Sequence, residues 1–515
     1  MDVIHYFDHG VYLAPDRDCL VMDDKRWTYR EAQRLTMKVA SALRRDGVQE
    51  GAKVAVLSPN DPAAFLCVLG AIRAHMVWVP LNPRSSTETL ITILEKFECE
   101  VLIYNSLYDD FAREAQQKLG CLTRLFCVDK DTSITMSVEQ WTHTAPDTFD
   151  IAPADPDAVV SIATTSGTTG APKGVLQTHR FYEHLVSSIV AVMPAETPPH
   201  YLAAGPMTHA AGTGTFHTFV RGGTVFVLPA AKPLLIASAI TQYGITDLVL
   251  PPTVIYGMLA EPTIRSFDYR SLRYFWYGTA PMSPDKVREA IEIFGPCMVS
   301  AWGQSEAVCG TFLRSSDLVR NGQILSEKRL ASCGRKFPFT DVAVMDPDGR
   351  LLGINAHGEL VIRSSGLMKG YYEDPQATEE VSRFGWHHTG DVGYFDEEGY
   401  FYIVDRMKDM IISGGFNIFP GEIENVLLSH AAVEDCAVIG VPDDKWGERI
   451  HAVIQLKSGI KASTEELLDL CRDRLAGMKT PKSLEFREEL PRSPVGKTLK
   501  RVLRDEYWAG RSRKV

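Results

Sequence analysis

The sequence lacks any spacing of cysteine and histidine that suits a structural metal, and it lacks a C-x-x-C motif. Its ten cysteines are scattered over 515 residues. Zinc sites and dithiol redox motifs place such residues close together at regular intervals. We therefore expect free thiols in a reducing environment, and we predict a cytoplasmic protein without a disulfide framework.

The sequence also lacks a signal peptide, a membrane-spanning run and an excess of basic residues. The N-terminal stretch MDVIHYFDHG has no basic region followed by an apolar one. The longest run without Asp, Glu, Lys or Arg, residues 197–220, is rich in Pro, Gly, Thr and His, which predicts loops and strands and no membrane span. With 54 Lys and Arg against 65 Asp and Glu the net charge is -11, so we expect no general binding of nucleic acids or anionic membranes.

The sequence is instead rich in apolar strands that alternate with helices. Hydrophobic residues make up 45% of the chain, which excludes disorder and suffices for large cores. Segments 53–57, 77–81, 100–104 and 125–128 read as buried strands, and the rhythm returns over 181–299. This alternation is typical of mostly parallel sheets that helices cover on both faces.

The composition changes after about residue 330, where short alternating stretches are separated by turns such as PDG, HG and EEG. They predict a small antiparallel β unit, which we expect to be a β-barrel. The expected fold class is α/β. A large N-terminal domain, residues 1–405, holds two βαβ-type sheets and the barrel, and a small mobile α+β domain covers 406–515 with its hinge near 406–408.

The most informative segment is TTSGTTGAPKG at 164–174, which follows an apolar strand. Its glycines let backbone N–H groups converge on an anion, its hydroxyls add donors, and Lys173 adds a point charge. The segment is not a Walker A loop, because G-x-x-x-x-G-K-[ST] does not fit it. A polyphosphate suits this composition, and a flexible linker is the alternative from composition alone. The candidate phosphate-binding residues are Thr165, Ser166, Gly167, Thr168, Thr169 and Gly170.

Further segments make a family resemblance specific. They are AWGQSEA at 301–307, TGD at 389–391, DRMKDMIISGGFNIFPGEIE at 405–424 and PRSPVGKTLKR at 491–501. Together with the loop, and in this order, they resemble the adenylate-forming superfamily of acyl-CoA synthetases, peptide-synthetase adenylation domains and beetle luciferases. The resemblance implies two steps. A carboxylate attacks the α-phosphate of ATP to give acyl-AMP and pyrophosphate, and a thiol then takes the acyl group and releases AMP.

The resemblance also implies roles for charged residues. Lys173 and the loop hydroxyls would hold the β- and γ-phosphates, and Lys497 would stabilise the charge that grows at the α-phosphate in the transition state. Glu306 would bind Mg²⁺, with Thr165 in the same metal site. His209 is the third candidate catalytic residue.

The nucleotide site departs mildly from the superfamily pattern. Trp302 stands where a Tyr usually stacks on adenine, and its larger ring should keep that contact. Ser305 stands where Thr is more common. Asp391 would accept hydrogen bonds from both ribose hydroxyls, and Arg406 would contact the ribose or a phosphate. The other nucleotide-site candidates are Gly278, Thr279, Ala280, Gly303 and Gln304.

The acyl pocket is expected around His209, with Ala210 and Gly212 leaving room and Tyr277 bounding it. If Tyr277 points inward, the pocket is short and suits a flat or short chain. The pocket segments offer no Asp for an α-amino group, which argues against amino acids. An aromatic or medium-chain carboxylic acid is therefore favoured.

By the resemblance, the small domain swings about Lys408. This would withdraw Lys497 and bring Gly414 and Gly415 beside the acyl-AMP, which would open a channel for the pantetheine of coenzyme A. Such alternation fits the general logic of a closure that completes one site and then another.

We therefore predict an AMP-forming acyl-CoA synthetase that uses ATP, Mg²⁺, coenzyme A and a carboxylic acid. It would bind no nucleic acid, and the sequence leaves a homodimer open. The alternatives are a ligase that loads a carrier protein, a luciferase-like oxygenase and a non-catalytic adenylate-binding module. The last would predict losses at Lys173, Glu306, Asp391, Arg406 or Lys497, and all five are present.

Overall fold

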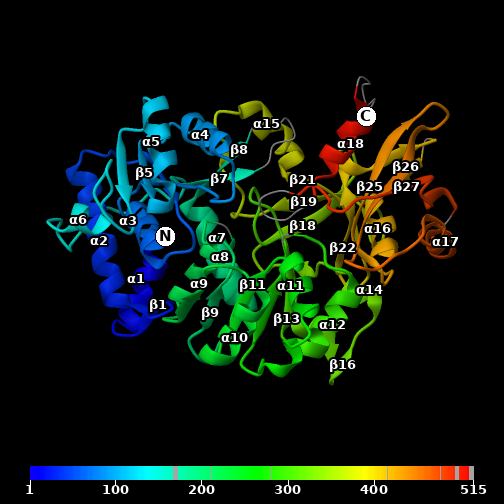
Figure 1. The fold of residues 1–515 in the computed structure, drawn as a ribbon, viewed down its shortest axis with the longest axis horizontal. Coiled ribbons are helices and arrows are strands. Elements are labelled where there is room, and N and C mark those ends of the chain that lie inside the picture. Colours follow the sequence, from blue (N-terminus) through cyan, green and yellow to red (C-terminus); the bar gives the residue numbers. More distant parts are fainter. Residues whose placement is uncertain are drawn as a thin grey trace.

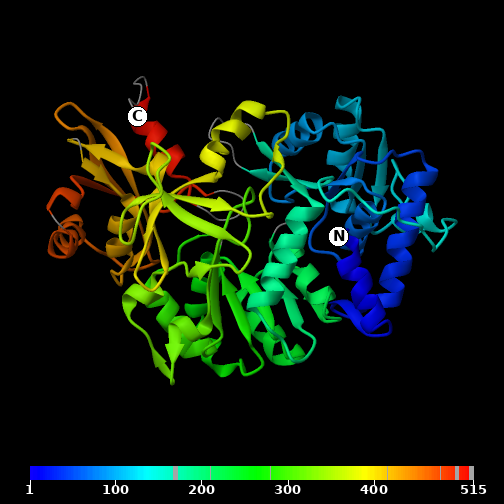
Figure 2. The same cartoon turned by 180° about the vertical axis from the view of Figure 1, so that it is seen from behind.

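A computed structural model describes residues 1–165, 172–208, 210–278, 280–414, 416–475, 477–492 and 498–509, without the side chains at 210 and 417. The N-terminal elements and the C-terminal elements lie at opposite ends of the molecule, with a second sheet and a small β unit between them (Figure 1; from behind, Figure 2). No helix in these ranges is long and apolar enough to cross a membrane.

The first βα half forms a sheet of strand order β20-β8-β7-β4-β3-β5-β6. Its central strands run parallel, as their apolar runs predict. β7 then turns back into antiparallel β8, and β20 joins from a point about 200 residues further along the chain. The strands are β3 (Lys53–Leu57), β4 (Val77–Pro80), β5 (Val101–Tyr104), β6 (Arg124–Cys127), β7 (Val159–Thr165), β8 (Lys173–Thr178) and β20 (Gly370–Tyr371).

The second sheet has the strand order β17-β14-β13-β12-β11-β9-β10-β1-β2, and it is parallel from β13 to β1. The 197–220 segment, expected as loops and strands, contains β9 and two short helices, α8 (Ala210–Thr213) and α9 (Thr215–Phe219). The strands are β1 (Asp18–Met22), β2 (Lys25–Thr28), β9 (His200–Ala203), β10 (Thr224–Val227), β11 (Asp247–Leu250), β12 (Tyr274–Tyr277), β13 (Met298–Trp302), β14 (Thr311–Leu313) and β17 (Arg335–Lys336). β15 (Val319–Arg320) and β16 (Gln323–Ile324) form a separate hairpin.

Helices cover these sheets on both faces. α7 packs its apolar side on one face of the second sheet, and α10, α11 and α12 contribute to the core on the other face. The helices of the N-terminal part are α1 (Ile4–Leu13), α2 (Tyr29–Arg45), α3 (Pro62–Arg73), α4 (Thr87–Lys96), α5 (Asp109–Lys118), α6 (Val138–Thr142), α7 (His179–Val192), α8 (Ala210–Thr213), α9 (Thr215–Phe219), α10 (Pro233–Tyr243), α11 (Pro252–Leu259), α12 (Pro284–Phe294), α13 (Ser315–Leu318), α14 (Glu327–Leu330) and α15 (Pro375–Glu380).

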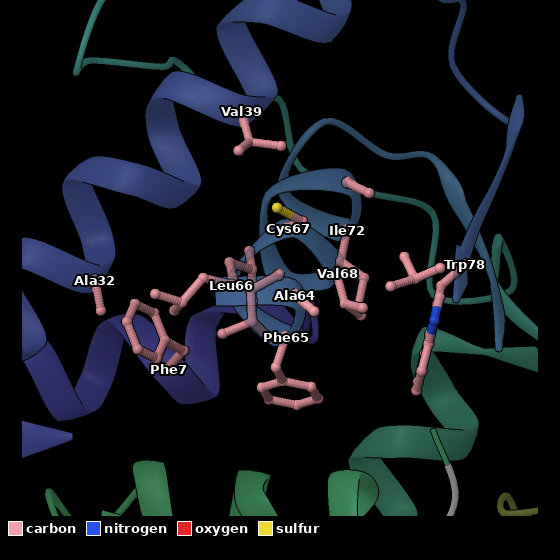
Figure 3. Close-up of a cluster of buried hydrophobic side chains, with 14 of the residues drawn as sticks. Phe7, Ala32, Val39, Ala64, Phe65, Leu66, Cys67, Val68, Ile72 and Trp78 are labelled. Atoms are coloured by element: carbon pink, nitrogen blue, oxygen red, sulfur yellow. The ribbon is translucent and has the colours of Figure 1, made fainter. Parts of the chain in front are cut away.

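The contact of α2 with α3 illustrates how the sequence specifies the core. Thr28 and Glu31 form the expected capping box at the start of α2. α3 is buried almost all round, and Figure 3 shows its side chains between α2 and Trp78 of β4. A Cβ on Gly70 would lie 2.6 Å from Cβ of Val39, so only glycine lets the two helices approach this closely.

The small β unit is an open sheet and not the expected barrel. Its order is β18-β19-β21-β22, and loops cover the two outer strands in place of pairing between them. On β22, Phe401 exchanges backbone hydrogen bonds with Cys333 and Gly334, and on β18 Val344 accepts one from Leu352. The strands are β18 (Asp341–Met345), β19 (Gly358–Arg363), β21 (His387–Phe395) and β22 (Phe401–Arg406).

The C-terminal elements form a compact α+β unit with its own apolar core. Its strand order is β24-β23-β26-β25, with β27 parallel to β26. The elements are β23 (Ile411–Ser413), β24 (Phe416–Ile418), α16 (Pro420–Leu428), β25 (Val433–Asp443), β26 (Gly447–Leu456), α17 (Thr464–Arg474), β27 (Ser483–Phe486) and α18 (Lys500–Trp508). Short 3-10 turns occupy Ser106–Tyr108, Ile264–Ser266, Arg383–Gly385, Met407–Asp409 and Gly477–Lys479.

Candidate active site

The turn after β13 presents several predicted residues from the carboxyl end of the second sheet, where ligands of open α/β sheets bind. Gln304 N–H donates to the oxygen of Ala307 at 2.8 Å, and Ala307 N–H returns the bond at 3.1 Å. A Cβ on Gly303 would lie 3.1 Å from that Ala307 oxygen, so glycine keeps the turn tight. The end of the adjacent strand β12 brings Gly278 beside the end of β13, because a Cβ there would lie 3.4 Å from the oxygen of Ala301.

Asp391 is the centre of a hydrogen-bonded cluster that joins the second sheet to the small β unit. Asp391 is 3% exposed. It accepts from Trp302 Nε1 at 2.8 Å and from Gln304 Nε2 at 3.3 Å, and it pairs with Arg406 Nε at 2.5 Å. The bonds fix the direction of the carboxylate before any ligand arrives. Four predicted nucleotide-site residues are thereby brought together.

Trp302 is more buried than we would expect of a side chain that only stacks on a ligand. It is 8% exposed and packs with Val342, Leu360 and Phe401 of the β unit. Its indole N–H holds Asp391, so burying the ring leaves no donor without a partner. Adenine stacking by Trp302 stays a prediction.

A second cluster joins Lys173 to Glu306 through a tyrosine that the sequence did not reveal. The Lys173 ammonium lies 4.8 Å from the ring centre of Tyr371, and the Tyr371 hydroxyl donates to Glu306 Oε1 at 3.0 Å. Tyr371 reaches this place because β20 pairs with β8, opposite Val175. Burial first, and then the Glu306 carboxylate, raise the pKa of the Tyr371 phenol, which keeps it a neutral donor.

Gln177 links the first sheet to the turn after β13. Its amide donates to the main-chain oxygen of Ser305 at 3.1 Å and accepts from Ser161 Oγ at 2.8 Å. The main-chain oxygen of Glu306 accepts from Met368 N–H at 2.7 Å. Gln177 of β8 and the segment just before β20 therefore hold the backbone that carries Ser305 and Glu306.

The phosphate-loop candidates are only partly described. Thr165 stands opposite Lys173 in the register of β7 and β8, so both flank the loop between these strands. The other predicted residues of the loop, Ser166, Gly167, Thr168, Thr169 and Gly170, lie outside the described residues. So do His209, Thr279, Gly415 and Lys497.

Tyr277 and the neighbours of Gly212 belong to different core clusters, and the role of Tyr277 as a boundary of the acyl pocket stays a prediction. Tyr277 belongs to the core on the α11 and α12 face of the second sheet. Ala211 and Phe216, on either side of Gly212, belong to the cluster that also contains residues of α7. Alternation along β12 places Trp276 on that α7 face instead, half-buried beside Phe312 at 5.7 Å between ring centres. Of the two neighbours Trp276 and Tyr277, it is therefore Trp276 that lies on the α7 face.

The expected hinge follows β22 directly. Lys408 is the middle residue of the 3-10 turn Met407–Asp409. Further on, Gly414 has φ of 60° and donates to the oxygen of Trp446 at 2.9 Å. A Cβ on Gly414 would lie 2.6 Å from the Trp446 ring, so glycine is required for both reasons.

Comparison with known proteins agrees with this geometry. The AMP-binding enzyme model matches residues 7–372, and the model of the AMP-binding enzyme C-terminal domain matches 422–497. The chain belongs to the AMP-binding enzyme family. It is thus an AMP-forming ligase of the adenylate-forming superfamily, and its α/β fold with a large N-terminal and a small C-terminal part is the fold of that superfamily.

Three similar proteins of the AMP-binding enzyme family illustrate its range. A feruloyl-CoA synthase from Amycolatopsis sp is 37% identical over 93% of this chain and 94% of its own. The medium/long-chain-fatty-acid–CoA ligase FadD8 of Mycobacterium tuberculosis is 31% identical over 97% of this chain and 89% of its own. The amide bond synthetase McbA from Marinactinospora thermotolerans matches with a TM-score of 0.89 at 27% identity, over 98% of this chain and 100% of its own.

The donors around Glu306 suit a magnesium ion that a polyphosphate brings with it. Mg²⁺ usually binds proteins through one or two carboxylates and keeps waters and phosphate oxygens as further ligands. Glu306 provides one such carboxylate, and the Tyr371 hydroxyl orients it. Among the described residues no cluster of three His, Cys, Asp or Glu side chains could hold a metal by itself.

Proposed function

We propose that this AMP-binding enzyme is an acyl-CoA synthetase, which converts a carboxylic acid to acyl-AMP with release of pyrophosphate and then to acyl-CoA with release of AMP. The observation that carries the proposal is the pair of clusters on one turn. On one side, Asp391 is bonded to Trp302, Gln304 and Arg406. On the other side, Glu306 accepts a hydrogen bond from Tyr371, and Lys173 lies over the Tyr371 ring. The set of groups around Asp391 suits a nucleoside, and the set around Glu306 suits a metal-bound polyphosphate.

In the first step the protein acts mainly through charge and position. Asp391 accepts the ribose hydroxyls while Trp302, Gln304 and Arg406 hold it in place. Lys173 acts on the β- and γ-phosphates, and Glu306 would hold Mg²⁺, which would neutralise phosphate charge when bound. Thr165 and the loop 166–170 add donors, and Lys497 stabilises charge at the α-phosphate. The acid itself is the nucleophile, so no covalent enzyme intermediate is needed.

The favoured substrates are aromatic or medium-chain acids. A Cβ on Gly212 would lie 1.7 Å from the oxygen of Met207, so the helix start there is packed closely and a side chain cannot occupy it. Trp276 offers a flat apolar face on the same side of the sheet. The printed activities of the feruloyl-CoA synthase and of FadD8 cover both kinds of acid. His209 lines the pocket by the superfamily resemblance.

The second step needs the small domain to turn. We assign residues 1–405 to the N-terminal domain and 406–515 to the C-terminal domain, with Lys408 as the pivot. The two family models end and begin on either side of this segment, at 372 and 422. Turning would bring Gly414 and Gly415 towards the acyl-AMP and admit the pantetheine of coenzyme A.

A cytoplasmic location suits the cysteines. All ten are free, and burial raises the pKa of Cys297 and Cys333 to about 12, so these thiols stay protonated and unreactive. Buried reduced thiols are typical of proteins in a reducing compartment.

Pyrophosphate release with ATP and Mg²⁺ tests the proposal. The panel contains benzoic, ferulic, octanoic and palmitic acids and phenylalanine, and we expect release with an aromatic or medium-chain acid. Addition of coenzyme A or of a carrier protein to the preformed acyl-AMP then identifies the acceptor. Transfer only to the carrier protein would favour the carrier-loading ligase, and absence of release with every acid would favour a non-catalytic adenylate-binding module.

A further inference from the structure

A buried group of three polar side chains lies behind the turn that carries Ser305 and Glu306. It consists of Ser161 on β7, Gln177 on β8 and Tyr182 on α7, which are 1%, 7% and 1% exposed. Ser161 and Gln177 stand directly opposite each other in the register of the two antiparallel strands. Polar groups that are buried without a hydrogen bond cost free energy, so each of the three needs a partner here.

The hydrogen bonds of this group leave the Gln177 amide one orientation. Its Oε1 accepts from Ser161 Oγ at 2.8 Å and from the Tyr182 hydroxyl at 3.4 Å, and the two hydroxyl oxygens lie 3.0 Å apart. On the other side its Nε2 donates to the main-chain oxygen of Ser305 at 3.1 Å. A main-chain oxygen only accepts, so the amide nitrogen has to face Ser305. Burial raises the pKa of Tyr182 to about 12, which keeps its hydroxyl protonated.

The bond to Ser305 holds one of the two peptide units that adjoin Glu306. The carbonyl of Ser305 and the N–H of Glu306 belong to one planar unit, so holding the carbonyl orients the whole unit. The peptide unit that follows Glu306 is held at both ends. Met368 N–H donates to the Glu306 oxygen at 2.7 Å, and Ala307 N–H donates to the Gln304 oxygen at 3.1 Å. A residue between two fixed peptide planes has a fixed direction of its Cα–Cβ bond, because its φ and ψ are then set.

Strand β8 connects this contact with the proposed phosphate-binding lysine. Lys173 and Gln177 are four residues apart on β8, and alternate residues of a strand share a face, so both side chains extend from the same face. Val175 lies between them and stands opposite Tyr371, whose hydroxyl donates to Glu306 Oε1 at 3.0 Å. One strand therefore places Lys173 directly, and it places Glu306 through Gln177 at the backbone and through Tyr371 at the carboxylate.

We propose that Gln177 is a positioning residue for the metal-bound nucleotide. Its amide holds the peptide between Ser305 and Glu306 in the orientation from which the Glu306 carboxylate can take a metal ion carried by the polyphosphate. Among the described residues, Gln177 is the partner that holds the carbonyl of this peptide. Gln177 therefore acts through the turn, and loss of its amide frees the peptide on one side of Glu306. This inference rests on the proposed function, because it takes Glu306 as the residue that holds Mg²⁺.

The binding of ATP to the full chain, measured by calorimetry with excess Mg²⁺ and again with EDTA, tests the proposal. Gln177→Met removes the amide with little change of side-chain volume. We expect the Kd of ATP with Mg²⁺ to rise about fivefold, because one net hydrogen bond supplies about that factor. The Kd without metal should stay the same, since only the metal-bound nucleotide uses Glu306. Titration of pyrophosphate release with Mg²⁺ should show a matching rise in the half-saturating concentration.

Variants of the two hydroxyl residues give a graded series. Ser161→Ala and Tyr182→Phe should shift the same constant in the same direction, and Ser161→Ala should shift it more because its bond to Oε1 is the shorter one. Either change should add little to Gln177→Met, because the amide that these hydroxyls orient is then absent. If Gln177→Met does not fold, Ser161→Ala decides by the same measurement. The matched control is Gln376→Met on α15, an exposed glutamine that bonds Glu380 at 3.4 Å, and it should change neither Kd.

An equal rise of the Kd with and without Mg²⁺ in Gln177→Met, or no rise in either, would overturn the role of Gln177. Glu306→Gln separates this result from the proposed function. If Glu306→Gln binds ATP with Mg²⁺ as tightly as the unaltered chain, the proposed metal ligand is wrong. If Glu306→Gln binds it more weakly and Gln177→Met does not, only the present inference is removed.

Discussion

The nucleotide side and the acyl side of the site are built by different means. On the nucleotide side, buried polar atoms are paired with one another, as Asp391 is with Trp302 and Arg406. On the proposed acyl side, Gly212 packs closely on the backbone of Met207, and Trp276 has a half-buried ring on the α7 face. Charge that develops at fixed atoms needs fixed partners, whereas the volume of a pocket can change with one side chain. We therefore expect substitutions on the nucleotide side to abolish activity and substitutions on the acyl side to redirect it.

Asp391→Ala should give the largest loss. It leaves the Trp302 and Arg406 donors without their partner and removes the acceptor for the ribose, so we expect kcat/KM for ATP to fall about 10²- to 10³-fold. Pyrophosphate release at varied ATP measures this loss. Asp348→Ala, an exposed carboxylate of the same β unit, is the control. A loss below tenfold in Asp391→Ala would contradict a polar framework on this side.

Lys408→Pro should separate the two steps by about a hundredfold. Proline fixes φ of residue 408 near -65°, a value that 3-10 turns also have, so it restricts rotation at the proposed pivot. Pyrophosphate release in the first turnover should stay near normal, and thioester formation should fall. Unchanged thioester formation together with normal pyrophosphate release would show that the chain does not turn at Lys408.

Tyr371→Phe should have an intermediate effect on the metal. The ring under Lys173 stays, but the hydrogen bond to Glu306 is lost, and we expect the apparent affinity for Mg²⁺ to fall about tenfold. Titration of pyrophosphate release with Mg²⁺ measures it. The neighbouring Tyr372→Phe removes a hydroxyl that bonds the exposed Glu98 at 3.3 Å, and it should change nothing. Equal effects of the two variants would refute an orienting role for Tyr371.

Trp276→Leu should have the smallest effect on total activity and the clearest effect on selectivity. A smaller side chain on the α7 face should raise the kcat/KM ratio of octanoate to benzoate by about fivefold to tenfold. Tyr277→Phe keeps the ring in the core on the opposite face and should leave the ratio as it is. If the kcat/KM ratio changed with Tyr277→Phe and not with Trp276→Leu, Tyr277 rather than Trp276 would line the acyl pocket.

Local patterns predicted most of the secondary structure. The capping box of Thr28 and Glu31, and the apolar strands at 53–57 and 77–81, are present where the sequence places them. Such features depend on residues a few positions apart, and the sequence displays these spacings directly. The prediction of a barrel was wrong. Alternating polar and apolar residues indicate that a strand has one buried and one exposed face. They do not indicate whether the outer strands of the sheet pair with each other or are covered by loops.

The sequence by itself determined the chemistry that this protein offers to a nucleotide. Lys173, Glu306, Asp391 and Arg406 stand in motifs whose order identified the superfamily. Only the tertiary structure determined which other residues contact and orient these motif residues. Tyr371 joins Lys173 and Glu306 because a distant strand pairs with β8, and Arg504 meets Lys408 because α18 packs back on the turn Met407–Asp409. These contacts connect parts of the chain that are far apart, so packing and strand register determine them, and no local spacing records them.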